Sequence, residues 1–221
     1  MGVQQLVEAD VFSVFARWAD RGAPYFADAQ DLFEQYVRPL AELSPAPRVD
    51  DLVQMNLAFT EWFLFEYKVC GGHTPVELSA GALDDAGDEQ DANDRAIRLG
   101  QVADTQRFSQ FAIEVADEAT GNVCLRDLMG EGRIELHRPE IVEHRRWRRG
   151  IISLRVAEVD GTFVEVGKTR LYDRAPEHGG AWGLEPTRLR PGPGTGSFFL
   201  DLLREVIGED GWYVNEMRVV A

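Results

Sequence analysis

The sequence predicts an α+β protein with an N-terminal helical lobe, followed by an antiparallel curved sheet or small β-barrel and a C-terminal helix. Two changes along the chain support this prediction. Apolar residues recur at helical spacing through about residue 104, and at every second position from there to about residue 175. The charge changes at the same point, because residues 1–104 carry 19 acidic and 7 basic side chains whereas residues 105–174 carry 12 of each. Residues 176–221 then supply a Gly/Pro loop, a short helix and a terminal strand or docking segment.

Two amphipathic helices are predicted at the start of the chain. The first ends at Arg21-Gly22, and the second begins near Pro24 and stops where Pro45 and Pro47 prevent its continuation. Their apolar faces consist of Leu6, Val11, Val14, Phe15 and Trp18 in the first helix, and of Phe26, Phe33, Tyr36, Val37 and Leu40 in the second.

A third helix is predicted to begin at Asp50 or Asp51, either of which can cap it, and to run to Val69 before a Gly-Gly pair ends it. The second half of this helix is apolar on nearly every side. A helix of that kind lies centrally, with other helices packed around it. We therefore predict that Trp62 and Phe63 are core residues.

The segment from Thr74 to Glu77 fits a capping box. The threonine side chain would accept from the third helical N–H, the following proline needs no donor, and the glutamate would reach back to the first residue. Six acidic residues follow between Asp84 and Asp94. We expect them to form a solvated loop that leads into a helix ending near Ala103.

Three segments beyond residue 104 alternate between apolar and polar or small residues, as half-buried strands do. Turns rich in glycine separate them at the positions where hairpins need turns. At least five strands at such spacing predict an antiparallel, strongly curved sheet or small barrel. The alternating apolar residues are Phe111, Ile113 and Val115, then Ile134 and Leu136, then Ile152, Leu154 and Val156, and the turns lie at 119–122, 130–132 and 160–161.

The last part of the chain contains a short predicted helix from Ser197 to Ile207. The glycine-rich run 192–196 before it lacks the lysine of a P-loop, and no strand leads into it. We interpret this run as a flexible connection whose helix is capped by Ser197, and not as a phosphate-binding loop.

The run W-F-L-F-E-Y at 62–67, followed by G-H-T-P-V-E at 72–77, resembles a segment of uncharacterised bacterial proteins, some of which end in a zinc-binding SEC-C tail. The resemblance also takes in residues 123–128 and, more loosely, 150–156. In those proteins a β region likewise follows the helical segment, so the resemblance implies the same architecture. This chain has no cysteine-rich tail after residue 175, so the zinc and partner binding of that tail are not implied.

Composition excludes several function classes. The net charge of −15 disfavours binding to duplex nucleic acid and to anionic lipid. No apolar run approaches the roughly 18 residues that a membrane span needs, and the first 20 residues lack the basic start of a signal peptide. We therefore expect a cytoplasmic protein in which Cys70 and Cys124 stay reduced and packed.

No catalytic, cofactor or metal site is predicted. His137, Glu143 and His144 lack metal-ligand spacing, and the acidic run lacks the order of an EF-hand loop. Cys70 has no identified base beside it, so we interpret it as a small buried hydrophobe.

Glu61, Glu66 and His73 could form an acid/base group, because they flank the third helix and the turn after it. Five residues along a helix rotate by about 140°, so the two glutamates do not share a helical face. Ion pairs at the rim of the helix are therefore the favoured interpretation.

A cluster of four arginines around one tryptophan, at 145–149, is a candidate interaction surface. Arginine and tryptophan often anchor interfaces, and an arginine can also stack on an aromatic ring. An acidic protein surface is the partner that this cluster would fit. The favoured alternative is an edge strand whose charges pair with the acidic helical lobe. The residues concerned are Arg145, Arg146, Trp147, Arg148 and Arg149.

Two function classes remain open. The favoured one is a non-catalytic interaction or regulatory protein of the bacterial cytoplasm, because no motif has the spacing of nucleophile and base or of metal ligands. The alternative is an enzyme or small-ligand binder with a pocket between the helical and β lobes, lined by Trp62, Glu66, Tyr67 and His73. A deep pocket with converging polar groups would favour the second class, and a seam filled by aromatic side chains would favour the first. The oligomeric state stays open.

Overall fold

The computed structural model describes residues 2–21, 23–41, 49–81, 89–143, 150–173, 196–207 and 218–220. The helices are α1 (Val3–Arg21), α2 (Ala23–Ala41), α3 (Val49–Phe65), α4 (Pro75–Ala80), α5 (Glu89–Thr105), α6 (Pro139–Glu143) and α7 (Phe198–Ile207), with a 3-10 turn, η1, at Cys70–Gly72. The strands are β1 (Arg107–Asp117), β2 (Asn122–Asp127), β3 (Arg133–His137), β4 (Ile151–Val159), β5 (Thr162–Glu165), β6 (Arg170–Asp173) and β7 (Arg218–Val220). This order confirms the predicted α+β class.

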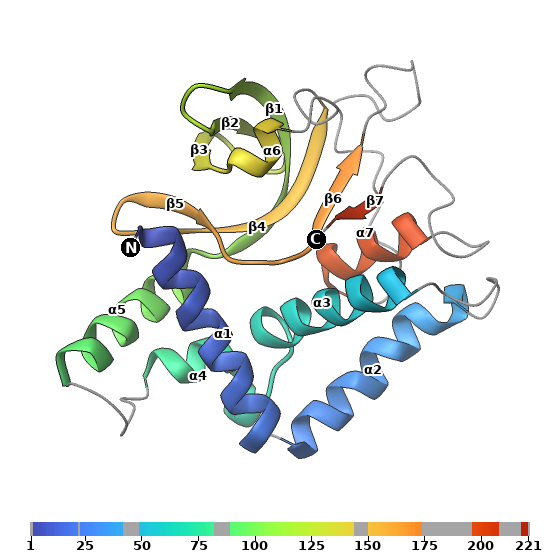
Figure 1. Ribbon diagram of the computed structural model, residues 1–221. Coiled ribbons are helices and arrows are strands. Elements are labelled where there is room, and N and C mark those ends of the chain that lie inside the picture. Colours follow the sequence, from blue (N-terminus) through green and yellow to red (C-terminus); the bar gives the residue numbers. More distant parts are fainter. Residues whose placement is uncertain are drawn as a thin grey trace.

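The described strands form one antiparallel sheet in the order β3-β2-β1-β4-β6-β7, with β5 paired to β4. Figure 1 shows that β1 and β4 bend strongly, so that the sheet curls on itself, and that the helices α1 to α5 gather on one side of it. The change from helix to strand falls between Thr105 and Arg107, and β6 ends at Asp173. The predicted curved antiparallel sheet is therefore confirmed.

Two apolar cores share the sheet between them. One lies inside the curl, where Phe111, Leu125, Ile152 and other residues of β1 to β4 pack with α6. The other lies between the opposite face and the helices, and includes Ala157 and Val159 of β4. Strand β4 is consequently buried on both faces.

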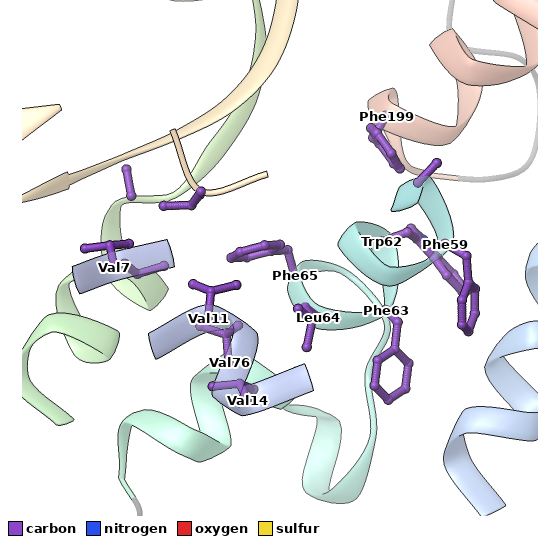
Figure 2. Packing of buried hydrophobic residues seen from close by; sticks show 14 of the residues in the cluster. Val7, Val11, Val14, Phe59, Trp62, Phe63, Leu64, Phe65, Val76 and Phe199 are labelled. Carbon is purple, nitrogen blue, oxygen red and sulfur yellow. The ribbon is translucent and has the colours of Figure 1, made fainter. Parts of the chain in front are cut away.

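Helix α3 lies at the centre of the helical core, as predicted. Trp62 is 5% exposed and Phe63 is fully buried. Aromatic rings from three helices surround them, because Phe26 of α2 and Trp18 of α1 lie 5.3 and 6.4 Å from the ring of Phe63. Figure 2 shows Phe59, Trp62 and Phe63 on one side of α3, with Leu64 and Phe65 turned toward the valines of α1.

The predicted extension of α3 to Val69 is wrong, because the helix ends at Phe65. The N–H groups of Glu66 and Tyr67 both donate to the carbonyl of Trp62, at 2.9 and 3.0 Å, which closes the last turn. The chain then leaves the helix, and Val69 donates to the carbonyl of His73.

Cys70 is exposed, so the prediction of a buried small hydrophobe is also wrong. The exposure of Cys70 follows from the early end of α3, because this cysteine lies in the surface turn η1 and not on the core helix. Cys124 is half-buried on β2, and both cysteines are free thiols.

The caps predicted at Thr74 and Ser197 are confirmed, but the cap predicted at Asp50 or Asp51 is wrong, because α3 begins at Val49 and both aspartates lie inside the helix. Thr74 Oγ1 accepts from the Glu77 N–H at 3.3 Å, and the Glu77 carboxylate accepts from the Thr74 N–H at 2.7 Å. Burial raises the pKa of the Glu77 carboxyl, but the Thr74 N–H and the charge of Lys68 outweigh it and leave that pKa below its ordinary value. Ser197 Oγ accepts from the Leu200 N–H at 3.1 Å and so caps α7.

The hairpin turns lie where they were predicted, with positive φ at Gly121, Gly132 and Gly161. Val115 departs from the predicted alternation and is 55% exposed. The cause is a register shift in the β1–β2 pair between Ile113 and Val115, which turns the strand over after Ile113.

Some predictions lie outside the described residues. They concern the prolines 45 and 47, the acidic residues 84–88, the loop 176–195 and the basic stretch 144–149. Within the part of the chain that the structure describes, no helix has the length and apolar character to cross a membrane.

Candidate functional site

A buried arginine joins the helices to the sheet. Arg155, on the helix-facing side of β4, is 2% exposed. Its Nε donates to Glu61 Oε1 at 3.1 Å, its Nη1 donates to Gln106 Oε1 at 2.6 Å, and its Nη2 pairs with Glu66 Oε1. The second oxygen of Glu66 accepts from the hydroxyl of Ser197. The guanidinium therefore links β4 to α3 and to the residue between α5 and β1, and Glu66 extends the link to the start of α7.

Aromatic rings enclose the same guanidinium. The carbon at its centre lies 5.1 Å from the ring centroid of Phe65, 5.6 Å from that of Phe108 and 5.7 Å from that of Phe199. These rings bury the guanidinium and its pair with Glu61, whereas the side chain of Glu66 stays 21% exposed. The seam at Arg155 is therefore a filled contact and not an open cleft.

The two glutamates reach one arginine because only Glu61 lies within the helix. Glu66 follows the last residue of α3, so the helical rotation of about 140° between them does not apply to it. The predicted ion pairs exist, but their predicted place at the helix rim is wrong for Glu61, which is 2% exposed. It is buried because β4 and the chain after β5 close over this side of α3.

That chain, residues 166–169, is called the crossing segment here, and it links β5 to β6 between β4 and α3. Glu61 Oε2 accepts the N–H groups of Lys168 and Thr169, both at 2.9 Å. On its other side the segment donates from the Val166 N–H to the Arg155 carbonyl at 3.0 Å. Burial raises the pKa of the Glu61 carboxyl above its ordinary value, and the charge of Arg155 and the two N–H groups oppose that effect.

Gly167 is required where the crossing segment passes Glu61. A Cβ at this position would lie 2.5 Å from Glu61 Oε2 and 2.6 Å from its other oxygen. A glycine therefore allows the backbone to approach the carboxylate closely enough for both hydrogen bonds to form.

An apolar cavity of about 230 Å³ lies beside this carboxylate, between α1, α3 and the crossing segment. It reaches the surface at Phe12, which is 70% exposed. Its polar lining consists of Glu8, Thr60, Glu61 and Lys168. Its apolar lining consists of Val11, Phe12, Phe15, Leu57, Leu64, Phe65 and Val166.

The charges at the mouth of this cavity belong to a balanced network. Arg138 pairs with Glu8 at 2.9 Å and with Glu165 at 2.7 Å, and Lys168 Nζ lies 3.6 Å from Glu8. Arg170 joins the network through Glu165 at 2.6 Å and through Glu140 at 3.1 Å. Three acidic side chains thus face three basic ones. Although burial acts to raise it, the bond from Arg138 and the charge of Lys168 hold the pKa of the Glu8 carboxyl below its ordinary value.

Hydrogen bonds hold both carboxylates of the site in place. Both oxygens of Glu61 and both oxygens of Glu66 accept hydrogen bonds from other groups of the chain. Among the described residues, no group of three or more His, Cys, Asp or Glu side chains is placed to hold a metal ion.

The four predicted pocket residues do not line this cavity. Trp62 is in the core, and the ring of Tyr67 packs 5.2 Å from it. Glu66 is bound to Arg155, as described above. His73 is exposed and lies 3.5 Å from Glu77, so it joins neither glutamate of the suggested acid/base group. His137 is exposed on β3 beside Asn122, as a surface histidine of a hairpin would be.

Sequence reasoning missed the residues on which the site depends, namely Arg155, Gly167, Glu8 and Lys168. One signal was present, because Arg155 lies between small residues and apolar residues in a strand with no other charge from 151 to 157. Such a strand is buried on both faces, and a charge within it needs a partner.

Comparison with known proteins gave no match to a family model, to a curated protein or to a solved structure. The resemblance drawn from the segments 62–67 and 72–77 therefore stays a prediction.

Proposed function

We propose that this is a non-catalytic binding protein that holds a small, neutral, apolar molecule in the cavity between α1, α3 and the crossing segment. The cavity itself, with its seven apolar side chains, is the observation that supports the proposal. It develops the alternative that the sequence left open, with a different lining from the one predicted.

The size of the cavity limits the ligand. An apolar cavity of about 150 Å³ in a protein core can stay dry and bind benzene. At about 230 Å³ this cavity has room for a somewhat larger molecule, such as a substituted benzene or a short branched alkane. It is smaller than the roughly 300–1,000 Å³ that drug-sized ligands occupy.

The charges favour a neutral ligand. Glu61 is bound to Arg155 and to two backbone N–H groups, and Glu8 is bound to Arg138. A charged ligand group would have to compete with these partners and lose its own hydration, which is costly in an apolar site. An uncharged molecule does not have to displace these partners, and it has no charged group whose hydration would be lost.

Titration with toluene, followed through the methyl resonances of Val11, Leu64 and Val166, tests the proposal. Saturable shifts at these methyl groups are expected. Val11→Phe should fill the cavity and abolish the shifts, whereas Val53→Phe, the same change at an exposed position of α3, should leave them in place. Absence of saturable shifts in the wild-type protein, or unchanged binding by Val11→Phe, would refute the proposal.

The interaction surface predicted at the basic stretch 144–149 remains a separate proposal. It is supported by the four arginines and the tryptophan of the sequence, and it requires its own test, which is given below.

A further inference from the structure

The crossing segment forms one wall of the cavity. Val166, Gly167 and Lys168 line the cavity, and the chain that carries them connects two strands without being a strand itself. A connecting segment opens more easily than a strand, because fewer backbone hydrogen bonds hold it. What fixes the segment therefore decides how well the cavity keeps its shape.

Glu61 is the side chain of α3 that holds the crossing segment in place. Its Oε2 receives the N–H groups of Lys168 and Thr169 at 2.9 Å each, and it is held in place by Arg155 at its other oxygen. Hydrogen bonds from N–H groups to an ionised carboxylate are stronger than those between neutral groups. Gly167 lets the backbone come close enough for both.

We infer that Glu61 is a positioning residue for the cavity, which holds the crossing segment as a preformed wall against which the ligand binds. The inference rests on the proposed function and adds to it the residue that sets ligand affinity. A preformed wall raises affinity because the ligand does not have to order the chain around itself. Loosening the wall should mainly speed dissociation, since changes within one site act chiefly on that rate.

The test uses Glu61→Gln, with Glu66→Gln as its control. In Glu61→Gln the charged Arg155 competes for the single amide oxygen, and the amide NH₂ is then turned toward the two N–H groups of the segment. Glu66→Gln makes the same change at the same guanidinium, but Glu66 neither bonds to the segment nor lines the cavity.

Two quantities are measured in each protein: hydrogen exchange at the Lys168 and Thr169 amides, and the dissociation constant of toluene. In Glu61→Gln we expect both amides to exchange about tenfold faster and toluene to bind about tenfold more weakly, which is the effect of one lost hydrogen bond. Glu66→Gln should change neither quantity to this extent. Toluene should also slow exchange at the two amides in the wild-type protein, because a ligand stabilises the state that binds it.

Equal exchange rates in the two variants would overturn the inference, as would faster exchange with unchanged toluene affinity. Wild-type protein that does not bind toluene overturns the proposed function, whereas binding that Glu61→Gln leaves intact overturns only the role of Glu61. If Glu61→Gln does not fold, Gly167→Ala replaces it, because the added methyl group displaces the carboxylate without removing its charge. Gly167→Ala should likewise speed exchange at the Lys168 and Thr169 amides and weaken the binding of toluene.

Discussion

Replacement of Arg155 by methionine tests the central contact of the fold. Methionine keeps the unbranched stem that packs between Phe65, Phe108 and Phe199, and it removes the charge. The carboxylates of Glu61 and Glu66 then lose their partner, and Glu61 does so in a buried position.

The expected loss of stability is large. Removing one partner of a buried ion pair costs about 3–5 kcal/mol, because the remaining charge stays buried without compensation. Here Glu61 is 2% exposed and cannot reach water without a movement of the crossing segment. We therefore expect Arg155→Met to lower the free energy of unfolding by about 3–5 kcal/mol.

Urea unfolding, followed by tryptophan fluorescence and by circular dichroism, measures this change. Arg133→Met is the matched control, because Arg133 is 65% exposed and pairs with Glu114 at 2.6 Å. An exposed pair contributes about 0.2–1 kcal/mol. The triple variant that also carries Glu61→Gln and Glu66→Gln should be more stable than Arg155→Met alone, because it leaves no unpaired charge.

A loss of less than about 1 kcal/mol in Arg155→Met, equal to that of the control, would refute this reasoning. It would mean that water reaches the carboxylate of Glu61 once the arginine is gone. A triple variant no more stable than Arg155→Met would show instead that the packing of the side chain, and not its charge, carries the contribution.

Four further predictions concern stability and binding. Trp62→Ala should lower the free energy of unfolding by about 3–5 kcal/mol as a large-to-small core change, and a neutral result would mean that the ring is not packed. Thr74→Ala should lower it by about 1 kcal/mol through loss of the cap, and unchanged urea midpoints would contradict this. Because burial raises the pKa of Glu61 above 4.5, its protonated form stabilises the fold below that pH, and this contribution is lost as pH rises through the folded-state pKa. The stability of the wild-type protein relative to Glu61→Gln should therefore fall as pH rises above 4.5, and a flat difference between pH 4 and pH 8 would contradict it. Replacing the four arginines of the basic stretch 144–149 by serine should lower stability at low salt and little at high salt, since exposed pairs are screened over roughly 10 Å at 0.1 M; unchanged stability, with polyanion binding by the wild-type protein, would favour a partner surface instead.

The parts of the fold that could be predicted depend on local signals. Helical spacing found α1 and α2, alternation found β3, and the capping box at Thr74 needs only residues close in the chain. The end of α3 could not be found in this way. Tyr67 and Val69 continue the apolar pattern, but the chain turns after Phe65, and Glu66 beyond the turn pairs with Arg155 on a distant strand.

The candidate site was missed for the same physical reason. Glu61 and Arg155 are 94 positions apart, and the crossing segment lies 107 positions from Glu61. Periodicity reveals which residues share a face of one helix or strand, and it cannot predict pairings between residues so far apart in the chain. The role of Gly167 could not be predicted from its neighbours in sequence either, because it depends on a carboxylate that approaches from another part of the chain.

The buried network also explains how an acidic helical region is held on the sheet at one position. Apolar contacts between α3 and β4 favour burial but are not directional, so they alone would allow the helix to slide. Hydrogen bonds require defined distances and angles. Glu61 forms three of them, to Arg155 on one side and to the crossing segment on the other. A shift of α3 by one residue would leave the charge of Arg155 without this partner, and the cost of an uncompensated buried charge selects the observed position over its neighbours. The same three bonds that fix the helix on the sheet also fix one wall of the cavity, so the position of α3 and the shape of the site depend on a single carboxylate.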